Sequence, residues 1–262
     1  MSDELLLEVE NGVATITINR AEKRNAFTDE MVRQWIRWLD DCNARDEIKV
    51  IVFTAVDKTF SSGGDTGGLA EKAQQTPLQA KQRMVANSQA LTRKVAEIDK
   101  PIIAAVNGAA VGGGMDLALM CDVRLATASA RFAETYAKMG LVPGVGGAWF
   151  LPRLIGTAAA LDMFWTSRWV DAEEALRLGI VNRVFPDDEF RAGVKAYAES
   201  IAKAAPLSIR TIKRLVYQGM STDMPTHLDA LSSHLALIRT SNDHQEAAAA
   251  VREKRPPKFT GT

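Results

Sequence analysis

One stretch, from Pro101 to Asp122, constrains the fold of this chain more than any other. An apolar run, Ile102–Val106, is followed by Asn107-Gly108, by Gly112-Gly113-Gly114 and then by a second apolar run. This order predicts a buried strand, a tight connection and the first turns of a helix. Glycines leave a ligand free to approach the backbone, and the first N–H groups of a helix have no partner inside it. Such free donors can hold a developing oxyanion. The alternative is that the glycines only let the helix pack closely on the strand.

The remainder of the 262 residues alternates strands with helices and then becomes helical. Asn11-Gly12 lies between two arms of strand-like residues and predicts a β-hairpin. The other predicted strands are 50–54, 102–106, 123–127 and 181–185, and the predicted helices are 28–44, 77–98, 148–154, 157–166, 172–178, 189–204 and further helices from 206 to 254. A glycine-rich loop is expected over 60–68. This pattern predicts an α/β fold with a right-handed βαβ core and a helical tail.

Composition narrows the class of protein. Lys+Arg and Asp+Glu number 32 each, so no net charge favours nucleic acid or an anionic membrane as a partner. Cys42 and Cys121 are the only cysteines, and the start of the chain lacks the pattern of a signal peptide, which together predict a cytoplasmic protein. No apolar run approaches the roughly 20 residues that span a bilayer. The histidines all lie in the tail at spacings unlike those of metal sites, so no metal is expected.

Two glycine-rich turns, Ser61–Asp65 and Asn107–Gly114, each follow an apolar strand, and Pro143–Gly147 forms a third. With these motifs the chain resembles the crotonase family of enoyl-CoA hydratases and isomerases over nearly its whole length. The resemblance implies a crotonase-like spiral core of repeated ββα units with an N-terminal hairpin and the acyl-CoA site in residues 1–200. It also implies a C-terminal helical region that mediates trimerisation in residues 201–262. Family members form trimers, often paired as hexamers, and a homotrimer or hexamer is expected here.

The resemblance also implies residue roles. Two backbone N–H groups, matching Gly64 and Gly113, would hold the thioester oxygen, because charge develops there in the transition state. Coenzyme A would bind along segments matching Arg24 to Ala26 and Gly64 through Asp65 to Thr66, with Lys254 near its nucleotide end. Coenzyme A is part of the substrate, so no separate cofactor is expected. Lys23 and Arg24 suit the phosphates as exposed charges, but a solvated surface pair explains them equally well.

The sequence departs from the hydratase pattern at the two glutamates that flank the substrate double bond. Asp116 and Tyr136 stand at those positions. Asp116 follows Gly113 by three residues and could act as the general base, or could simply stabilise the start of a helix. Tyr136 is a hydrogen-bond donor or acid, or else a wall of the acyl pocket. Glu134 shares a face with Tyr136 only if the segment is extended.

These residues leave three functions open. The first is an enoyl-CoA hydratase, with Asp116 as the main acid and base and Tyr136 assisting. The second is an isomerase or ring-processing member of the family, which needs a single proton-shuttling carboxylate. The third is a non-catalytic protein that binds acyl-CoA. The acyl group itself is expected to contact side chains of the segment from Glu71 to Lys94 and of the helical tail, where no motif identifies it.

Overall fold

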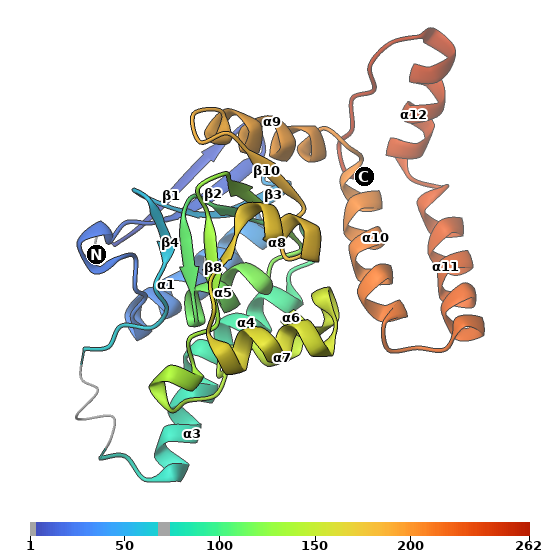
Figure 1. Ribbon diagram of the computed structural model, residues 1–262. Coiled ribbons are helices and arrows are strands. Elements are labelled where there is room, and N and C mark those ends of the chain that lie inside the picture. The colour runs from blue at the N-terminus through green and yellow to red at the C-terminus, as the bar shows by residue number, and fades with distance from the viewer. Residues whose placement is uncertain (1–3, 68–73) are drawn as a thin grey trace.

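The computed structural model describes residues 4–67 and 74–262. Gly68 and Glu71, and the first residues of the chain, lie outside that range. The main sheet has six strands in the order β1-β2-β3-β5-β7-β10, parallel except for the antiparallel pair β1 and β2 (Figure 1). Its strands are β1 (Leu5–Glu10), β2 (Val13–Ile18), β3 (Val50–Ala55), β5 (Ile102–Val106), β7 (Val123–Thr127) and β10 (Arg183–Phe185). The predicted hairpin is confirmed: Asn11 and Gly12 have φ of 50° and 80°, as its tight turn requires.

The main sheet is covered on both faces, which explains why β3 and β5 are apolar without alternation. On one face Ile51, Phe53 and Ile102 belong to the larger core cluster, which also takes in residues of α1 (Asp29–Ala44), α4 (Ser88–Glu97) and α5 (Gly113–Leu119). On the other face Val52 and Ile103 pack with residues of α9 (Phe190–Ala202). Trp35 is fully buried against Phe53, so it is a core residue.

A second, four-stranded sheet with the order β4-β6-β8-β9 was not predicted. Its strands are β4 (Thr59–Ser61), β6 (Ala109–Val111), β8 (Arg131–Ala133) and β9 (Val170–Asp171). None is longer than three residues, too short for a periodic pattern, and β4 occupies the start of the segment predicted as a loop. β4 and β6 are parallel with Ser61 beside Ala110. The two glycine-rich turns therefore follow the C-terminal ends of adjacent parallel strands, on the same side of the sheet.

The remaining elements agree broadly with the sequence pattern. One difference is that the helix expected over 77–98 is divided into α3 (Pro77–Ala86) and α4, because Asn87 has φ −113° and ψ −95°. Asn is a weak helix former whose side chain competes for backbone groups, and this makes a break there tolerable. The other short elements are η1 (Ala21–Lys23), η2 (Ala137–Met139), α6 (Gly147–Ile155), α7 (Thr157–Thr166) and α8 (Ala172–Leu178).

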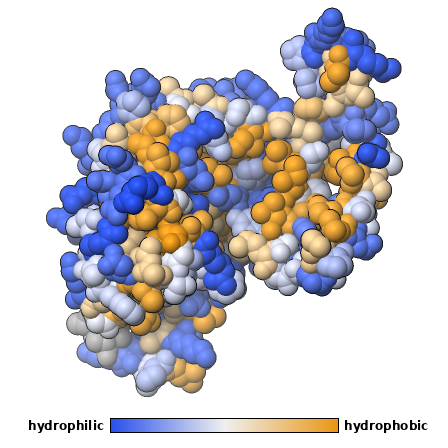
Figure 2. Space-filling view, turned by 45° about the vertical axis from the view of Figure 1, so that its right-hand side comes forward, coloured by the Kyte–Doolittle hydropathy of each residue, from blue (hydrophilic) through white to orange (hydrophobic). Residues whose placement is uncertain are grey.

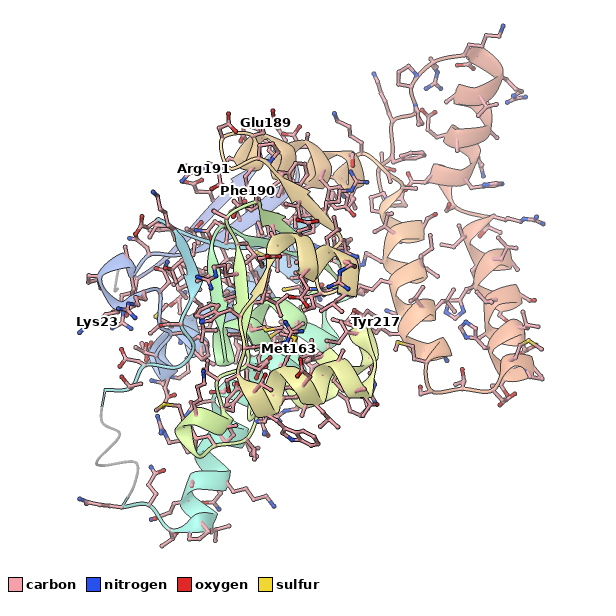
Figure 3. All side chains as sticks on the ribbon, viewed as in Figure 1. Lys23, Met163, Glu189, Phe190, Arg191 and Tyr217 are labelled. Atoms are coloured by element: carbon pink, nitrogen blue, oxygen red, sulfur yellow. The ribbon has the colours of Figure 1, made fainter. Side chains whose placement is uncertain are left out.

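The last three helices form an arm that projects from the core in Figure 1: α10 (Pro206–Gly219), α11 (Met224–Ile238) and α12 (Asn242–Glu253). Polar contacts attach α10 to the core, where Arg210 pairs with Asp99 at 2.8 Å and Lys213 with Asp122 at 2.8 Å. Tyr217 extends from α10 toward the core (Figure 3), and its hydroxyl donates to Asp122 at 2.8 Å. The arm starts after α9 ends, and the predicted division at residue 201 stays a prediction. Across the described ranges, no helix is both long and apolar enough to cross a membrane.

Candidate active site

The two predicted backbone donors, Gly64 and Gly113, lie close together. The Gly113 nitrogen is 3.2 Å from the point that a Cβ on Gly63 would occupy, and the Gly64 nitrogen is 3.5 Å from the corresponding point on Gly113. Within residues 4–67 and 74–262, neither N–H finds a hydrogen-bond acceptor. For Gly113 the reason is its place as the first residue of α5, where no earlier helical carbonyl faces it. The pair thus offers two free donors from adjacent turns.

The neighbouring glycines make this approach possible. A Cβ on Gly114 would lie 2.1 Å from the Ser61 carbonyl oxygen, so α5 packs directly on the end of β4. Gly63 and Gly112 have φ of 98° and 50°, in the left-handed region that favours glycine. The glycines of this stretch therefore differ in what they do: Gly114 permits close packing of α5 on β4, and Gly113 presents a free N–H.

The structure brings Asp116 and Tyr136 together. Asp116, on α5, is 0% exposed, and its Oδ2 accepts a hydrogen bond from the Tyr136 hydroxyl at 2.6 Å. Tyr136 is half-buried and lies just after β8, at the start of η2. Its ring is near Gly112, because a Cβ there would lie 3.9 Å from the ring carbon that bears the hydroxyl. The dyad therefore borders the turn that supplies the Gly113 N–H.

Burial sets the protonation states of the dyad. It raises the pKa of Asp116 to about 6, although the Tyr136 hydrogen bond and the nearby N–H groups of Gly147 and Val145 oppose the shift. Burial and the adjacent Asp116 charge raise the pKa of Tyr136 far above its usual range, so Tyr136 is a neutral donor at physiological pH. Asp116 is then mostly ionised at neutral pH. Its pKa is close enough to neutral pH for the carboxylate to accept and return a proton.

Glu134 is a third acid at this place, and the sequence left its direction open. It is 0% exposed, and neither of its carboxyl oxygens has a partner among the described atoms. A Cβ on Gly147 would lie 2.0 Å from Asp116 Oδ1 and 3.2 Å from Glu134 Oε1, so the two carboxyl groups face the same point. Burial and the Asp116 charge raise the pKa of Glu134 to about 10. The extended backbone ends with β8 at Ala133, and Tyr136 has helical φ and ψ. The side chains of Glu134 and Tyr136 nevertheless both lie next to Asp116.

The two segments expected to bind coenzyme A lie side by side. The Ser62 N–H donates to the Arg24 carbonyl at 3.0 Å, and the Asp65 N–H donates to Phe27 at 2.9 Å. Arg24 and Thr66 are exposed, as a ligand contact requires. Sequence reasoning gave no role to Arg20. Its guanidinium ties the segments together, because it donates to the Ala26 carbonyl at 2.7 Å and to the Asp65 carboxylate at 2.8 Å.

Lys254 does not join these residues within one chain. It is the C-terminal cap of α12, which Figure 1 shows in the projecting arm, whereas Figure 3 labels Lys23 on the opposite side of the molecule. No three His, Cys, Asp or Glu side chains of the described ranges lie together as a metal site would need. A groove of about 630 Å³ lies on the α9 face of the main sheet, and none of the predicted site residues lines it.

Comparison with known proteins identifies the family of this chain. A family model described as enoyl-CoA hydratase/isomerase matches residues 8–262. The short-chain-enoyl-CoA hydratase of Clostridium acetobutylicum is 31% identical over 97% of this chain and 96% of its own length. The 1,2-epoxyphenylacetyl-CoA isomerase of Escherichia coli is 31% identical over 100% of both chains. The crystal structure of an enoyl-CoA hydratase from Bacillus anthracis superposes with a TM-score of 0.92 at 29% identity, covering 99% of this chain and 100% of that one.

The solved structure confirms the predicted crotonase-like α/β fold, and the family model confirms the resemblance drawn from the glycine-rich turns. The coverage of both chains is nearly complete, so the match concerns the core and the helical arm together. This chain belongs to the enoyl-CoA hydratase/isomerase family.

Proposed function

We propose that this protein is an enoyl-CoA hydratase, which adds water reversibly across the 2,3-double bond of an enoyl-CoA. Membership of the family, with a hydratase relative that matches along almost the whole chain, supports this class of reaction. The single observation that carries the proposal is the buried Asp116–Tyr136 hydrogen bond, which lies beside two unpaired backbone N–H groups. An acid–base dyad next to preorganised donors is what conjugate addition to a thioester requires.

In the proposed reaction the N–H groups of Gly64 and Gly113 bind the thioester oxygen. As water attacks C3, negative charge moves onto that oxygen, and the two donors stabilise the enolate more than the starting enoyl-CoA. Loss of one such donor typically costs about 3 kcal/mol of activation free energy. The donors keep their positions because α5 packs on β4 through Gly114.

Asp116 and Tyr136 transfer the proton between water and C2. Tyr136 is the more exposed of the two, and its hydroxyl already donates to Asp116. The water proton passes to the Tyr136 oxygen as the phenolic proton moves to the Asp116 carboxylate, which leaves Tyr136 neutral. The enolate then takes a proton at C2 by the reverse transfer. The hydroxyl ends on C3, one hydrogen on C2, and Asp116 is again ionised.

A second function, isomerisation of the double bond, is favoured by one observation. Of the two buried acids, Asp116 accepts the Tyr136 hydroxyl, whereas neither Glu134 oxygen has a hydrogen-bond partner among the described residues, and burial raises the pKa of Glu134. Asp116 is therefore the better placed of the two to act as the base. A double-bond shift removes one proton and returns one, and a single base suffices for it. The isomerase relative from Escherichia coli is consistent with this alternative.

Activity measurements separate these functions. Purified protein is offered crotonyl-CoA and a 3-enoyl-CoA, the enoyl-thioester absorbance is followed, and products are identified by mass. Hydratase activity adds the mass of water, isomerase activity changes absorbance at constant mass, and Asp116→Asn abolishes either one. Binding of acyl-CoA without turnover of any substrate in a panel of saturated, unsaturated, branched and cyclic acyl groups would overturn both enzyme proposals and leave the non-catalytic acyl-CoA-binding function.

Coenzyme A is proposed to enter as part of the substrate, with no separate cofactor. Arg24, Ala26, Asp65 and Thr66 would line its path, and Arg20 keeps the two segments together. We expect Arg24→Ala to raise KM with little change in kcat, because the contact is the same in the ground and transition states. An unchanged KM would remove Arg24 from the proposed path. Both cysteines are free and buried, which agrees with the proposed cytoplasmic location.

We also propose a homotrimer, or a hexamer of paired trimers, in which the arm contacts a neighbouring subunit. Figure 2 shows apolar residues gathered on the surface of α10 and α11. The exposed apolar side chains there are Ile212, Val216, Met220, Met224, Leu228, Leu235 and Leu237. An exposed patch of this kind is typical of a protein interface. Sedimentation equilibrium tests the proposal, and a monomer at all concentrations would contradict it. Lys254, which is remote from the site of its own chain, would then lie near the coenzyme A bound by a neighbouring subunit.

A further inference from the structure

The reaction proposed above uses Asp116 and Tyr136 but gives no role to Glu134, the third buried acid. Three carboxyl oxygens at this place have no hydrogen-bond partner among the described residues: Asp116 Oδ1, Glu134 Oε1 and Glu134 Oε2. Buried polar atoms are nearly always hydrogen-bonded. Neither residue forms an ion pair with any Lys, Arg or His of the ranges 4–67 and 74–262. Two adjacent buried charges of the same sign would therefore be unstable.

Protonation of one of the two carboxyl groups removes this repulsion. A protonated Glu134 is a hydrogen-bond donor, and Asp116 Oδ1 faces the same point next to Gly147 as Glu134 Oε1. Asp116 is the better place for the remaining charge, because Tyr136 already donates to its Oδ2 and the N–H groups of Val145 and Gly147 lie nearby. Among the described residues, no N–H or hydroxyl group donates to Glu134. The charge and the proton are thus assigned by the neighbours of each acid.

We propose that Glu134 is a positioning residue: it carries the proton of a one-proton carboxyl pair and donates it to Asp116 Oδ1. Asp116 is then held from both sides, by Tyr136 on one oxygen and by Glu134 on the other. This orients the carboxylate toward the Tyr136 hydroxyl and keeps it ionised at neutral pH. The groups that face Glu134 are Asp116, from α5, and Tyr136, from its own segment. The effect of Glu134 on the reaction rate rests on the proposed function, whereas the one-proton carboxyl pair itself does not.

Two substitutions separate a donated hydrogen bond from mere packing. Glu134→Gln keeps the length of the side chain and an N–H donor for Asp116, whereas Glu134→Leu keeps similar bulk without a donor. We expect Leu to lower kcat about tenfold or more, the effect of losing a hydrogen bond to a charged group. It also moves the acidic limb of kcat/KM to higher pH, because Asp116 loses a donor that favours its ionised form. Gln should restore most of this activity and the pH profile.

Infrared difference spectroscopy at neutral pH tests the proton itself, independently of turnover. Exposed carboxyl groups are ionised there, so a buried protonated acid gives a separate carbonyl band. We expect the band in the wild type and in Glu173→Gln, a matched control at an exposed site on α8, but not in Glu134→Gln. The proposal is overturned if the band is absent from the wild type, if Gln is as impaired as a folded Leu variant, or if Leu leaves the pH profile unchanged. An inactive wild type that keeps the band would contradict the proposed function and leave the carboxyl pair intact.

Discussion

Substitution of Gly147 by alanine tests the geometry of the acid cluster most sharply. A Cβ at this position would lie 2.0 Å from Asp116 Oδ1 and 3.0 Å from its Cγ. Because an oxygen needs at least about 3 Å, the carboxylate or the start of α6 has to move by about 1 Å, and a misplacement of that size costs roughly a hundredfold in rate. We therefore predict a fall in kcat of about a hundredfold, equivalent to about 2.7 kcal/mol of activation free energy.

The assay is steady-state hydration of crotonyl-CoA, with the melting temperature measured in parallel. Little change in stability is expected, since alanine is a better helix former than glycine and partly offsets the strain. Gly144→Ala is the matched control: its new Cβ would meet the flexible end of Met84 at 3.2 Å and no carboxylate. If folded Gly147→Ala keeps kcat within about threefold of the wild type, the position assigned to Asp116 is wrong.

Four further outcomes follow from the same cluster. Asp116→Asn should lower kcat by about 10² to 10⁴, the contribution of a general base, and wild-type kcat/KM should fall as pH drops through about 6, where Asp116 becomes protonated. Tyr136→Phe removes a donor that lowers the pKa of Asp116, so the acidic limb should move to higher pH in a pH–rate profile. Glu134→Gln should stabilise the protein increasingly as pH rises: the pKa of Glu134 is raised to about 10 from 4.5, so the native state binds more protons than the unfolded state between these values and loses stability there as pH increases. Thermal melts of both proteins across that range measure the difference, and parallel curves would contradict it.

Much of the main sheet could be predicted because its signals are local. Asn11-Gly12 specifies a hairpin through backbone conformation, and the uninterrupted apolar run at Ile102–Val106 indicates a strand covered on both faces. The second sheet could not be predicted in this way. β4 and β6 have three residues each, and what holds them is the packing of α5 through Gly114 on Ser61, a contact between residues far apart in the chain.

The candidate site could likewise be predicted only in part. The positions of Asp116 and Tyr136 followed from resemblance to the family, and the structure joins them by a hydrogen bond. Glu134 could not be assigned, because its direction depends on how the backbone turns after β8. Gly147 was identified only as part of a turn. Its importance comes from the 2.0 Å approach to Asp116, which is a property of how α6 meets α5.

The central claim is that the Gly64 and Gly113 N–H groups bind one thioester oxygen beside the Asp116–Tyr136 dyad. A crystal structure with a non-reactive enoyl-CoA analogue tests it most directly. We predict that the thioester oxygen lies about 3 Å from both nitrogens, with C2 and C3 near the Tyr136 hydroxyl. A thioester oxygen bound to neither N–H, or an acyl chain directed away from Tyr136, would contradict the account.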